Sequence, residues 1–205
     1  MRALRVLAVL PLLACQTVAA GLTDRAEALL SDYRARARPT FAAEPEAPRA
    51  WARGQFTVYA RSSPRGAVLE RVAITRRRGE AVAVAVEVLG GGEQLRARLT
   101  FARQPGGAEA LPLLLTTATI RRGEGPEVES VGTAPADVLE LAAALLIAPP
   151  GSGRPRLLEA PAGRFEGCLG EAHPAVPLSG VVVQQRDGVV RELLEFGEDG
   201  GGELF

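Results

Sequence analysis

The chain has 205 residues, 47% of them apolar, which fits one globular domain with a terminal extension. Its 24 basic and 24 acidic side chains cancel, so no overall field attracts nucleic acid, and nucleic acid is not expected as a partner. The chain contains no lysine, which excludes a P-loop and Schiff-base chemistry.

The first twenty residues have the layout of a secretory signal. Arg2 and Arg5 give a positive start, an apolar run follows from Val6 to Ala14, and small residues come next. The run is too short for a transmembrane helix, which needs about 20 apolar residues. We therefore expect the protein to be exported.

Two cleavage sites suit this signal. The segment "LLAC", ending at Cys15, resembles the lipobox of bacterial lipoproteins, in which the cysteine is acylated and begins the mature chain. The segment "VAA" would instead let ordinary signal peptidase remove residues 1–20. We favour a signal peptide over 1–14, lipidation of Cys15 and a periplasm-facing site on the outer membrane. A soluble periplasmic or secreted protein is the alternative.

The segment after the signal predicts a helix and a spacer. Apolar residues at helical spacing predict an amphipathic helix with Thr23 as its N-cap and Pro39 as its stop. Three prolines within 39–48 predict an extended, semi-stiff spacer. We therefore expect an N-terminal helix and tether over 15–50 and a single β-rich domain over 51–205.

Alternating apolar and polar residues predict strands in much of the remaining chain. The pattern is clearest over 55–61, 81–89 and 93–103, and a run of glycines would join the last two as a hairpin. A second hairpin is predicted at Asp187 and Gly188, because these residues accept the positive φ of tight turns.

One further helix is predicted after Thr133. It has Pro135 in its first turn, ends at Pro149 and is apolar almost all round, with Glu140 as its one interior charge. Burial against a sheet is the expected use of such a helix.

Two other segments have two interpretations each. Residues 76–78 are three arginines before a glycine turn, which suits a solvated turn or contact with lipid phosphate or a partner's acids. The glycine-rich stretch from 197 onwards is typical of a frayed terminus, although Leu204 and Phe205 could dock on the domain.

These elements predict an α+β fold, in which a curved, mainly antiparallel, half-barrel-like sheet is covered by one or two helices. We expect the helices to shelter the one apolar face of the sheet. Incomplete cover would leave a pocket for an acyl chain or another apolar ligand. The residues expected to face this space, as core or as ligand-binding side chains, are Val84, Val86, Leu95, Leu99, Phe101, Leu141 and Leu145.

Few residues suit catalysis. His173 is the only histidine, so a histidine-dependent triad or a multi-histidine metal site is not expected. Cys168 has no intramolecular partner once Cys15 is acylated or removed, and is expected to be buried on a strand. A carboxylate pair stays open, because its members are defined by separation in space. We predict no enzyme, no catalytic or metal site and no cofactor.

The C-terminal third carries the segments "PAGRFEGC" at 161–168, "VPLSGVV" at 176–182 and "ELLEFG" at 192–197. In this order they resemble an aGxFxC, VPxxGxV, ELxxFG pattern of uncharacterised exported bacterial lipoproteins. The resemblance implies an architecture similar to that of periplasmic lipoprotein carriers and receptors, in which a curved antiparallel sheet wraps an apolar cavity closed by helices.

The predicted function is that of an exported, lipid-anchored, non-enzymatic envelope protein. It would meet the membrane through its N-terminal lipid and bind an apolar ligand, such as an acyl chain or lipid, or an envelope protein. The alternative is a purely structural or interaction lipoprotein with a filled core. A hydrolase that uses a carboxylate pair is the third hypothesis.

Overall fold

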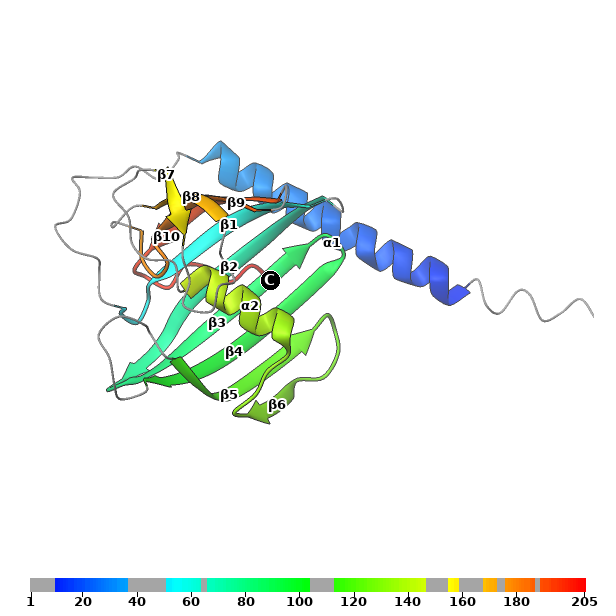
Figure 1. The fold of residues 1–205 in the computed structure, drawn as a ribbon. Coiled ribbons are helices and arrows are strands. Elements are labelled where there is room, and N and C mark those ends of the chain that lie inside the picture. The colour runs from blue at the N-terminus through cyan, green and yellow to red at the C-terminus, as the bar shows by residue number, and fades with distance from the viewer. Residues whose placement is uncertain are drawn as a thin grey trace, which may run out of the picture.

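The structure is a computed structural model and describes residues 10–36, 51–63, 66–103, 113–146, 155–158, 168–172, 176–186 and 189–205. In these residues two helices pack on one open antiparallel sheet, so the predicted α+β fold is confirmed (Figure 1). The helices are α1 (Leu10–Ala35) and α2 (Ala136–Leu146). The strands are β1 (Phe56–Ser63), β2 (Gly66–Arg78), β3 (Ala81–Gly90), β4 (Glu93–Arg103), β5 (Leu113–Arg122), β6 (Val128–Val131), β7 (Pro155–Leu158), β8 (Cys168–Ala172), β9 (Val181–Arg186) and β10 (Val189–Gly197).

The strand order is β6-β5-β4-β3-β2-β1-β10-β9-β8-β7. From β1 to β6 each strand pairs with the next, which makes a meander. Strand β10 then pairs with the other edge of β1, and β9, β8 and β7 continue the sheet. The two parts of the sheet therefore meet at one place, the β1–β10 seam.

Both predicted hairpin pairs are present. Strands β3 and β4 pair through the turn at Gly91 and Gly92, which have φ values of 62° and 82° that suit glycine. Strands β9 and β10 pair antiparallel as expected, while the turn residues Asp187 and Gly188 lie outside the described part of the chain.

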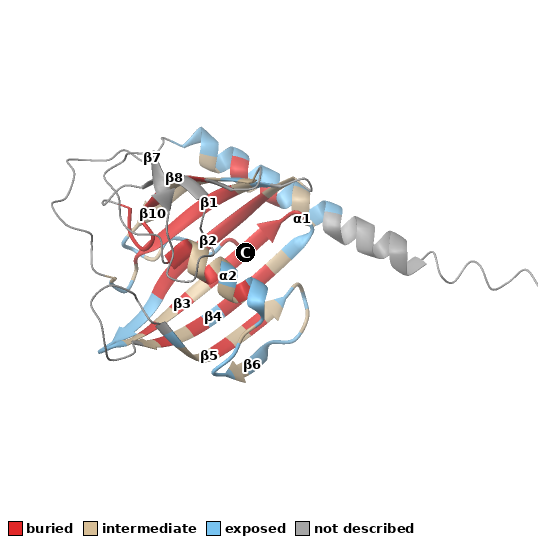
Figure 2. Ribbon diagram, viewed as in Figure 1, coloured by how far each residue is buried: buried red, intermediate tan, exposed pale blue. Residues whose placement is uncertain are grey.

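The two helices cover opposite faces of the sheet. We call the face of the sheet that α2 covers the α2 side, and the face that α1 covers the α1 side (Figure 2). The apolar residues of the α2 side pack against Val138, Ala142, Leu145 and Leu146 of α2. Those of the α1 side pack against Ala26 and Leu30 of α1. The expectation that both helices shelter a single apolar face is therefore wrong. The physical reason is that central strands are apolar on both faces and must lose contact with water on both sides. In β1, for example, Val58 and Tyr59 point to opposite faces and both are buried.

Helix α2 matches its prediction closely. It begins directly after Pro135, whose carbonyl accepts the N–H groups of Val138 and Leu139. Glu140 is exposed, and the buried residues lie on the opposite stripe of the helix. Its end at Leu146 precedes the predicted stop at Pro149, which lies outside the described residues.

Helix α1 begins earlier than predicted. Thr23 lies in its middle and is not an N-cap, because the helix starts at Leu10. Proline is tolerated in a first helical turn, and the alanines and leucines after Pro11 are strong helix formers, so the helix continues through Gly21. Its second half packs on the sheet although it precedes Trp51, where the predicted domain begins. Neither helix has the length and apolar character of a membrane-spanning segment in the described residues.

The C-terminal segment docks on the sheet. Leu204 is buried on the α1 side, and its N–H donates to Glu87 Oε2 at 3.2 Å. The Arg96 guanidinium stacks over the Phe205 ring, with Cζ 5.0 Å from the ring centroid. The prediction that this segment docks on the domain is therefore confirmed, and the prediction of a frayed terminus is wrong. The buried Leu204 side chain and the hydrogen bond from its N–H to the Glu87 carboxylate hold the segment on the sheet.

Helix α1 lies close to the sheet at Gly90. A Cβ atom there would lie 2.7 Å from the Ala26 Cβ and 2.3 Å from the Ala67 carbonyl oxygen. The φ of Gly90 is 113°, a region that side-chain-bearing residues avoid. The absence of a side chain at Gly90 therefore lets both α1 and the β2 backbone lie close to β3 at this position.

Gly90→Ala is expected to lower the free energy of unfolding by about 3 kcal/mol, because overpacking adds to backbone strain. Chemical denaturation would measure it. Gly79→Ala is the matched control: Gly79 also has positive φ, 57°, but nothing lies within 4 Å of its Cβ position. Equal losses in the two variants would contradict the proposed close contact.

Candidate functional site

The seven predicted ligand-facing residues lie together on the α2 side. Six of them, on β3, β4 and α2, are at most 6% exposed, and Leu141 is half-buried against the same cluster. The strand register pairs Val84 with Leu99 directly. They form the packed layer beneath α2, which is the core role that the sequence allowed. Ligand binding by these residues stays a prediction.

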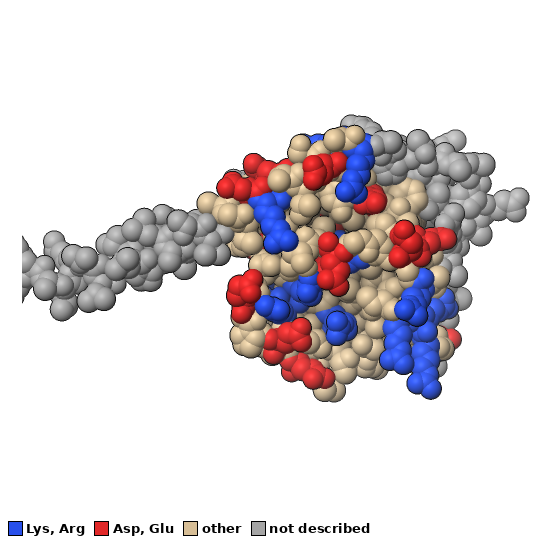
Figure 3. Space-filling view, turned by 180° about the vertical axis from the view of Figure 1, so that it is seen from behind, with Lys and Arg blue, Asp and Glu red and all other residues tan. Residues whose placement is uncertain are grey.

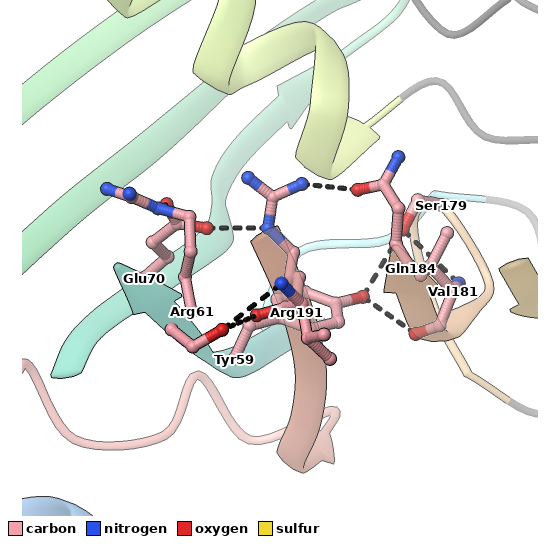
Figure 4. Close-up of polar contacts among 9 residues, drawn as sticks. Tyr59, Arg61, Glu70, Ser179, Val181, Gln184 and Arg191 are labelled. Carbon is pink, nitrogen blue, oxygen red and sulfur yellow. Dashed lines mark hydrogen bonds and ion pairs between the residues drawn. The ribbon is translucent and has the colours of Figure 1, made fainter. Parts of the chain in front are cut away.

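A polar cluster lies on the same side of the sheet, near the β1–β10 seam (Figure 4). We call it the Glu70 cluster, and its members are Tyr59, Arg61, Glu70, Ser179, Gln184 and Arg191. These residues come from β1, β2, β9, β10 and the turn before β9. Five segments of the chain therefore contribute to one site.

Glu70 is the centre of this cluster and is only 1% exposed. Its two carboxylate oxygens accept hydrogen bonds from Arg61 Nε at 2.5 Å and from Arg191 Nε at 2.6 Å. The two arginines are direct neighbours across the seam, where like charges repel each other. Glu70 offsets this repulsion, and Gln184 adds a further contact by accepting from Arg191 Nη1 at 2.5 Å.

The charge state of Glu70 follows from these contacts. Burial alone would raise its pKa, but the charges and hydrogen bonds of Arg191 and Arg61 outweigh burial and hold the pKa below the ordinary value of 4.5. The carboxylate is therefore ionised at neutral pH. A glutamate held in this way is suited to structure rather than to proton transfer near neutral pH.

Tyr59 fixes the turn that leads into β9. Its hydroxyl donates to the Val181 carbonyl at 3.0 Å and lies 3.3 Å from Ser179 Oγ. Burial raises the pKa of Tyr59, so the hydroxyl keeps its proton and remains a donor. Leu178 in this turn has φ 66°, a conformation that costs a non-glycine residue about 1 kcal/mol or more.

The segment "VPLSGVV" therefore has a structural explanation. Val176 and Ser179 are buried, and Gly180 has φ 73°. Its turn supplies the groups to which Tyr59 bonds. The segment "ELLEFG" lies in β10, where a bulge between Val58 and Tyr59 adjusts the pairing with β1. Of "PAGRFEGC", the structure describes only the backbone of Cys168, at the start of β8.

A second buried carboxylate, Glu87, lies on the α1 side. Arg71 Nη1 donates to its Oε2 at 3.1 Å, and Arg96 Nε lies 3.4 Å from its Oε1. Glu87 also accepts the Leu204 N–H, so it ties β2, β3, β4 and the C-terminal segment together. Glu70 and Glu87 occupy opposite faces and do not form a carboxylate pair for hydrolysis.

Two pockets open on the surface at the α1 side. A groove of about 630 Å³ runs between α1 and the strands β1, β2 and β10, and a smaller pocket of about 230 Å³ includes Arg25, Arg96 and Arg121. The groove contains both Arg34 and Glu192, so its charges are mixed. None of the seven predicted residues lines either pocket.

The search for metal ligands gives a limited result. No group of three or more histidine, cysteine or acidic side chains is arranged to hold a metal ion within the described residues. The side chains of Cys15, Cys168 and His173 lie outside that description.

Sequence reasoning did not identify the Glu70 and Glu87 clusters. A signal was present, because Glu70 and Arg71 interrupt the apolar stretch "VLERV" and Glu87 interrupts the apolar stretch "VAVEVL". A charge in such a strand centre indicates either an exposed face or a buried ion pair. The strand pattern alone does not distinguish them.

Glu70→Gln is expected to lower the free energy of unfolding by about 3 kcal/mol at neutral pH, because it leaves Arg61 and Arg191 without their shared counter-charge. Glu124→Gln is the control, since Glu124 forms an exposed pair with Arg121 and its loss should cost less than about 1 kcal/mol.

The same measurement at several pH values tests the charge state. A lowered pKa means that the ionised Glu70 stabilises the fold above pH 4.5, and that this stabilisation disappears as the pH falls through the folded-state pKa. The difference between wild type and Glu70→Gln should therefore shrink in acid. A difference that stays constant with pH would contradict the assignment.

Comparison with known proteins adds no relative. No family model matches this chain, and neither the curated proteins nor the solved structures contain a significant match. The resemblance to exported lipoproteins in the C-terminal third thus stays a prediction.

Proposed function

We propose that the protein is an exported, lipid-anchored, non-enzymatic envelope protein that acts by binding a partner protein. The observation that carries the proposal is the continuity of α1. This one helix contains the position of Cys15 and, from Ala26 onwards, packs into the core of the sheet domain.

The helix sets a short distance between anchor and domain. In a mature chain that begins at Cys15, Ala26 lies eleven positions later and is the first buried residue among the side chains that the structure describes, which begin at Ala20. A helix rises 1.5 Å per residue, so this separation is roughly 16 Å. The proline-rich spacer follows α1 in the sequence and does not separate the anchor from the packed helix. The domain would therefore sit close to the membrane in a restricted orientation.

Two features support binding over catalysis. The buried carboxylates Glu70 and Glu87 are each held by two arginines, so both are engaged in ion pairs within the sheet. They also lie on opposite faces of the sheet, each tying several strands together.

A partner protein is favoured over an apolar ligand because of how the α2 side is packed. An acyl chain between α2 and the sheet would have to part the buried cluster that contains Leu145, Val84 and Leu99, all three of which are fully buried. Separating close-packed apolar side chains costs free energy, because each contact between them and each buried methylene group stabilises the fold.

Cys15→Ala, in the full chain with its signal, is expected to move the protein from the membrane fraction to the soluble periplasmic fraction, because a stable anchor needs its acyl chains. Fractionation followed by mass spectrometry of the N-terminus measures this. Cys168→Ala is the control and should leave the protein in the membrane. Unchanged membrane association of Cys15→Ala would contradict lipidation.

Organic-solvent extraction of purified Cys15→Ala protein is expected to yield no stoichiometric lipid, because the apolar side chains beneath α2 already pack against one another. Mass spectrometry of the extract is the measurement, and using this variant avoids signal from covalent acyl chains. One lipid molecule per chain would instead support the apolar-ligand hypothesis.

A further inference from the structure

We propose that the part of the α1 side that α1 leaves uncovered is the docking surface for the partner, and that this partner is an acidic protein. The inference rests on the proposed function, because it identifies the chemistry of the partner. We call this surface the arginine face, and it consists of Arg76, Arg78, Arg98, Ala81, Ala83 and Ala85.

The strand register places these residues on one face. Residues that pair across antiparallel strands point to the same side, and the pairs are Arg78 with Ala81, Arg76 with Ala83, and Arg98 with Ala85. The alanines alternate with residues of the α2-side cluster, so they point to the α1 side. The three arginines thus flank a row of alanines on β3.

A bulge between Ile74 and Arg76 gives the arginines this placement. It shifts the pairing by one residue, so that Arg77 lies opposite Val82 on the α2 side. Arg77 donates to the Trp51 carbonyl and takes no part in the arginine face. The run of three arginines is therefore divided between the two faces of the sheet.

No described element covers this surface. The three arginines are exposed, and the three alanines are half-buried and belong to neither core cluster. Helix α1 packs at the other end of β3, near Gly90, and the C-terminal segment bonds to Arg71 and Glu87 through Gly200 and Leu204. The end of the β2–β3 hairpin is exposed in Figure 2, and basic side chains gather at the corresponding lower right of Figure 3.

The charges of the arginine face are unbalanced. Arg71, which is buried, and Arg61 and Arg191, which are half-buried, all pair with glutamates. By contrast, no carboxylate of the described residues forms an ion pair with Arg76, Arg78 or Arg98. Guanidinium groups match carboxylates in geometry and can bond to them through two N–H groups. Carboxylate side chains on a partner are therefore the complementary chemistry.

The alanine row favours a close-fitting partner. Alanine is depleted in strands, yet it occupies three alternate positions of β3, while valines occupy the positions between them. Small side chains between long arginines let another chain approach the sheet closely, and the half-buried methyl groups of the alanines supply apolar contact. Such a mixed apolar and charged surface is typical of a protein interface.

Orientation favours a protein over the anchoring membrane. The β2–β3 turn and Gly90 lie at opposite ends of β3, roughly 30 Å apart at the usual rise per strand residue. Helix α1 leaves the sheet near Gly90 and projects beyond it towards the anchor position (Figure 1). The β2–β3 end of the arginine face would therefore lie far from the membrane that holds the lipid.

The test compares two full-chain triple variants that lose the same charge. One is Arg76→Gln/Arg78→Gln/Arg98→Gln, and the matched control is Arg25→Gln/Arg34→Gln/Arg36→Gln, which changes two exposed arginines of α1 and the exposed arginine directly after it. The probe is fluorescent poly-L-glutamate, measured by anisotropy at low and high salt. Thermal unfolding checks that both variants remain folded.

The arginine-face variant is expected to lose about tenfold or more in affinity for poly-L-glutamate, while the control stays within about twofold of wild type. Equal losses in the two variants would overturn the proposal.

A second arm uses phosphatidylcholine vesicles with and without phosphatidylglycerol. The proposal would also be overturned if the three substitutions weakened binding to the anionic vesicles but not binding to poly-L-glutamate. That result would identify a membrane as the occupant of the arginine face.

Neither arm depends on Cys15. Failure of the fractionation experiment would remove the lipid anchor but leave the binding difference between the two triple variants. Failure of the binding experiment would remove the arginine face and leave the anchor in place.

Discussion

The fold depends on the ion pairs that Glu70 forms across the β1–β10 seam. This seam is where the meander and the C-terminal strands join in the sheet order, so the integrity of the whole sheet relies on it. Arg61 and Arg191 face each other there, and the buried carboxylate on β2 makes their proximity favourable. One glutamate thus connects the consecutive strands β1 and β2 with β10, whose Arg191 lies 121 residues after Glu70.

The strands and α2 could be predicted because their information is local. Val84 and Leu99 follow the alternation of their own strands, and the apolar stripe of α2 follows from its composition. The placement of α1 could not be predicted in this way. It depends on the close approach of Ala26 to Gly90 of β3, and no pattern within either segment indicates that approach. The start of α1 was missed for a related reason, since the apolar run that suits a signal peptide is also a good helix former.

The candidate sites show the same division. The seven apolar residues could be grouped because period two places them on one face of neighbouring strands. The partners of Glu70 and Glu87 could not be assigned, because each carboxylate is balanced by arginines from other strands and burial is decided by the assembled sheet. The arginine face was visible only as a charged run. The bulge after Ile74, which separates Arg77 from its neighbours, has no signature in the residue types.

The position of β10 inside the sheet has a consequence for the order of assembly. Strand β1 lies early in the sequence and can pair with β2 on one edge. Its other edge stays unpaired until β10, the most C-terminal of the described strands, is present. Pairing between such distant segments is slow, because a long loop must close before its contacts form. A chain that is threaded through a membrane from its N-terminus would therefore complete this sheet only after nearly all of it has emerged, which keeps it unfolded for as long as translocation requires.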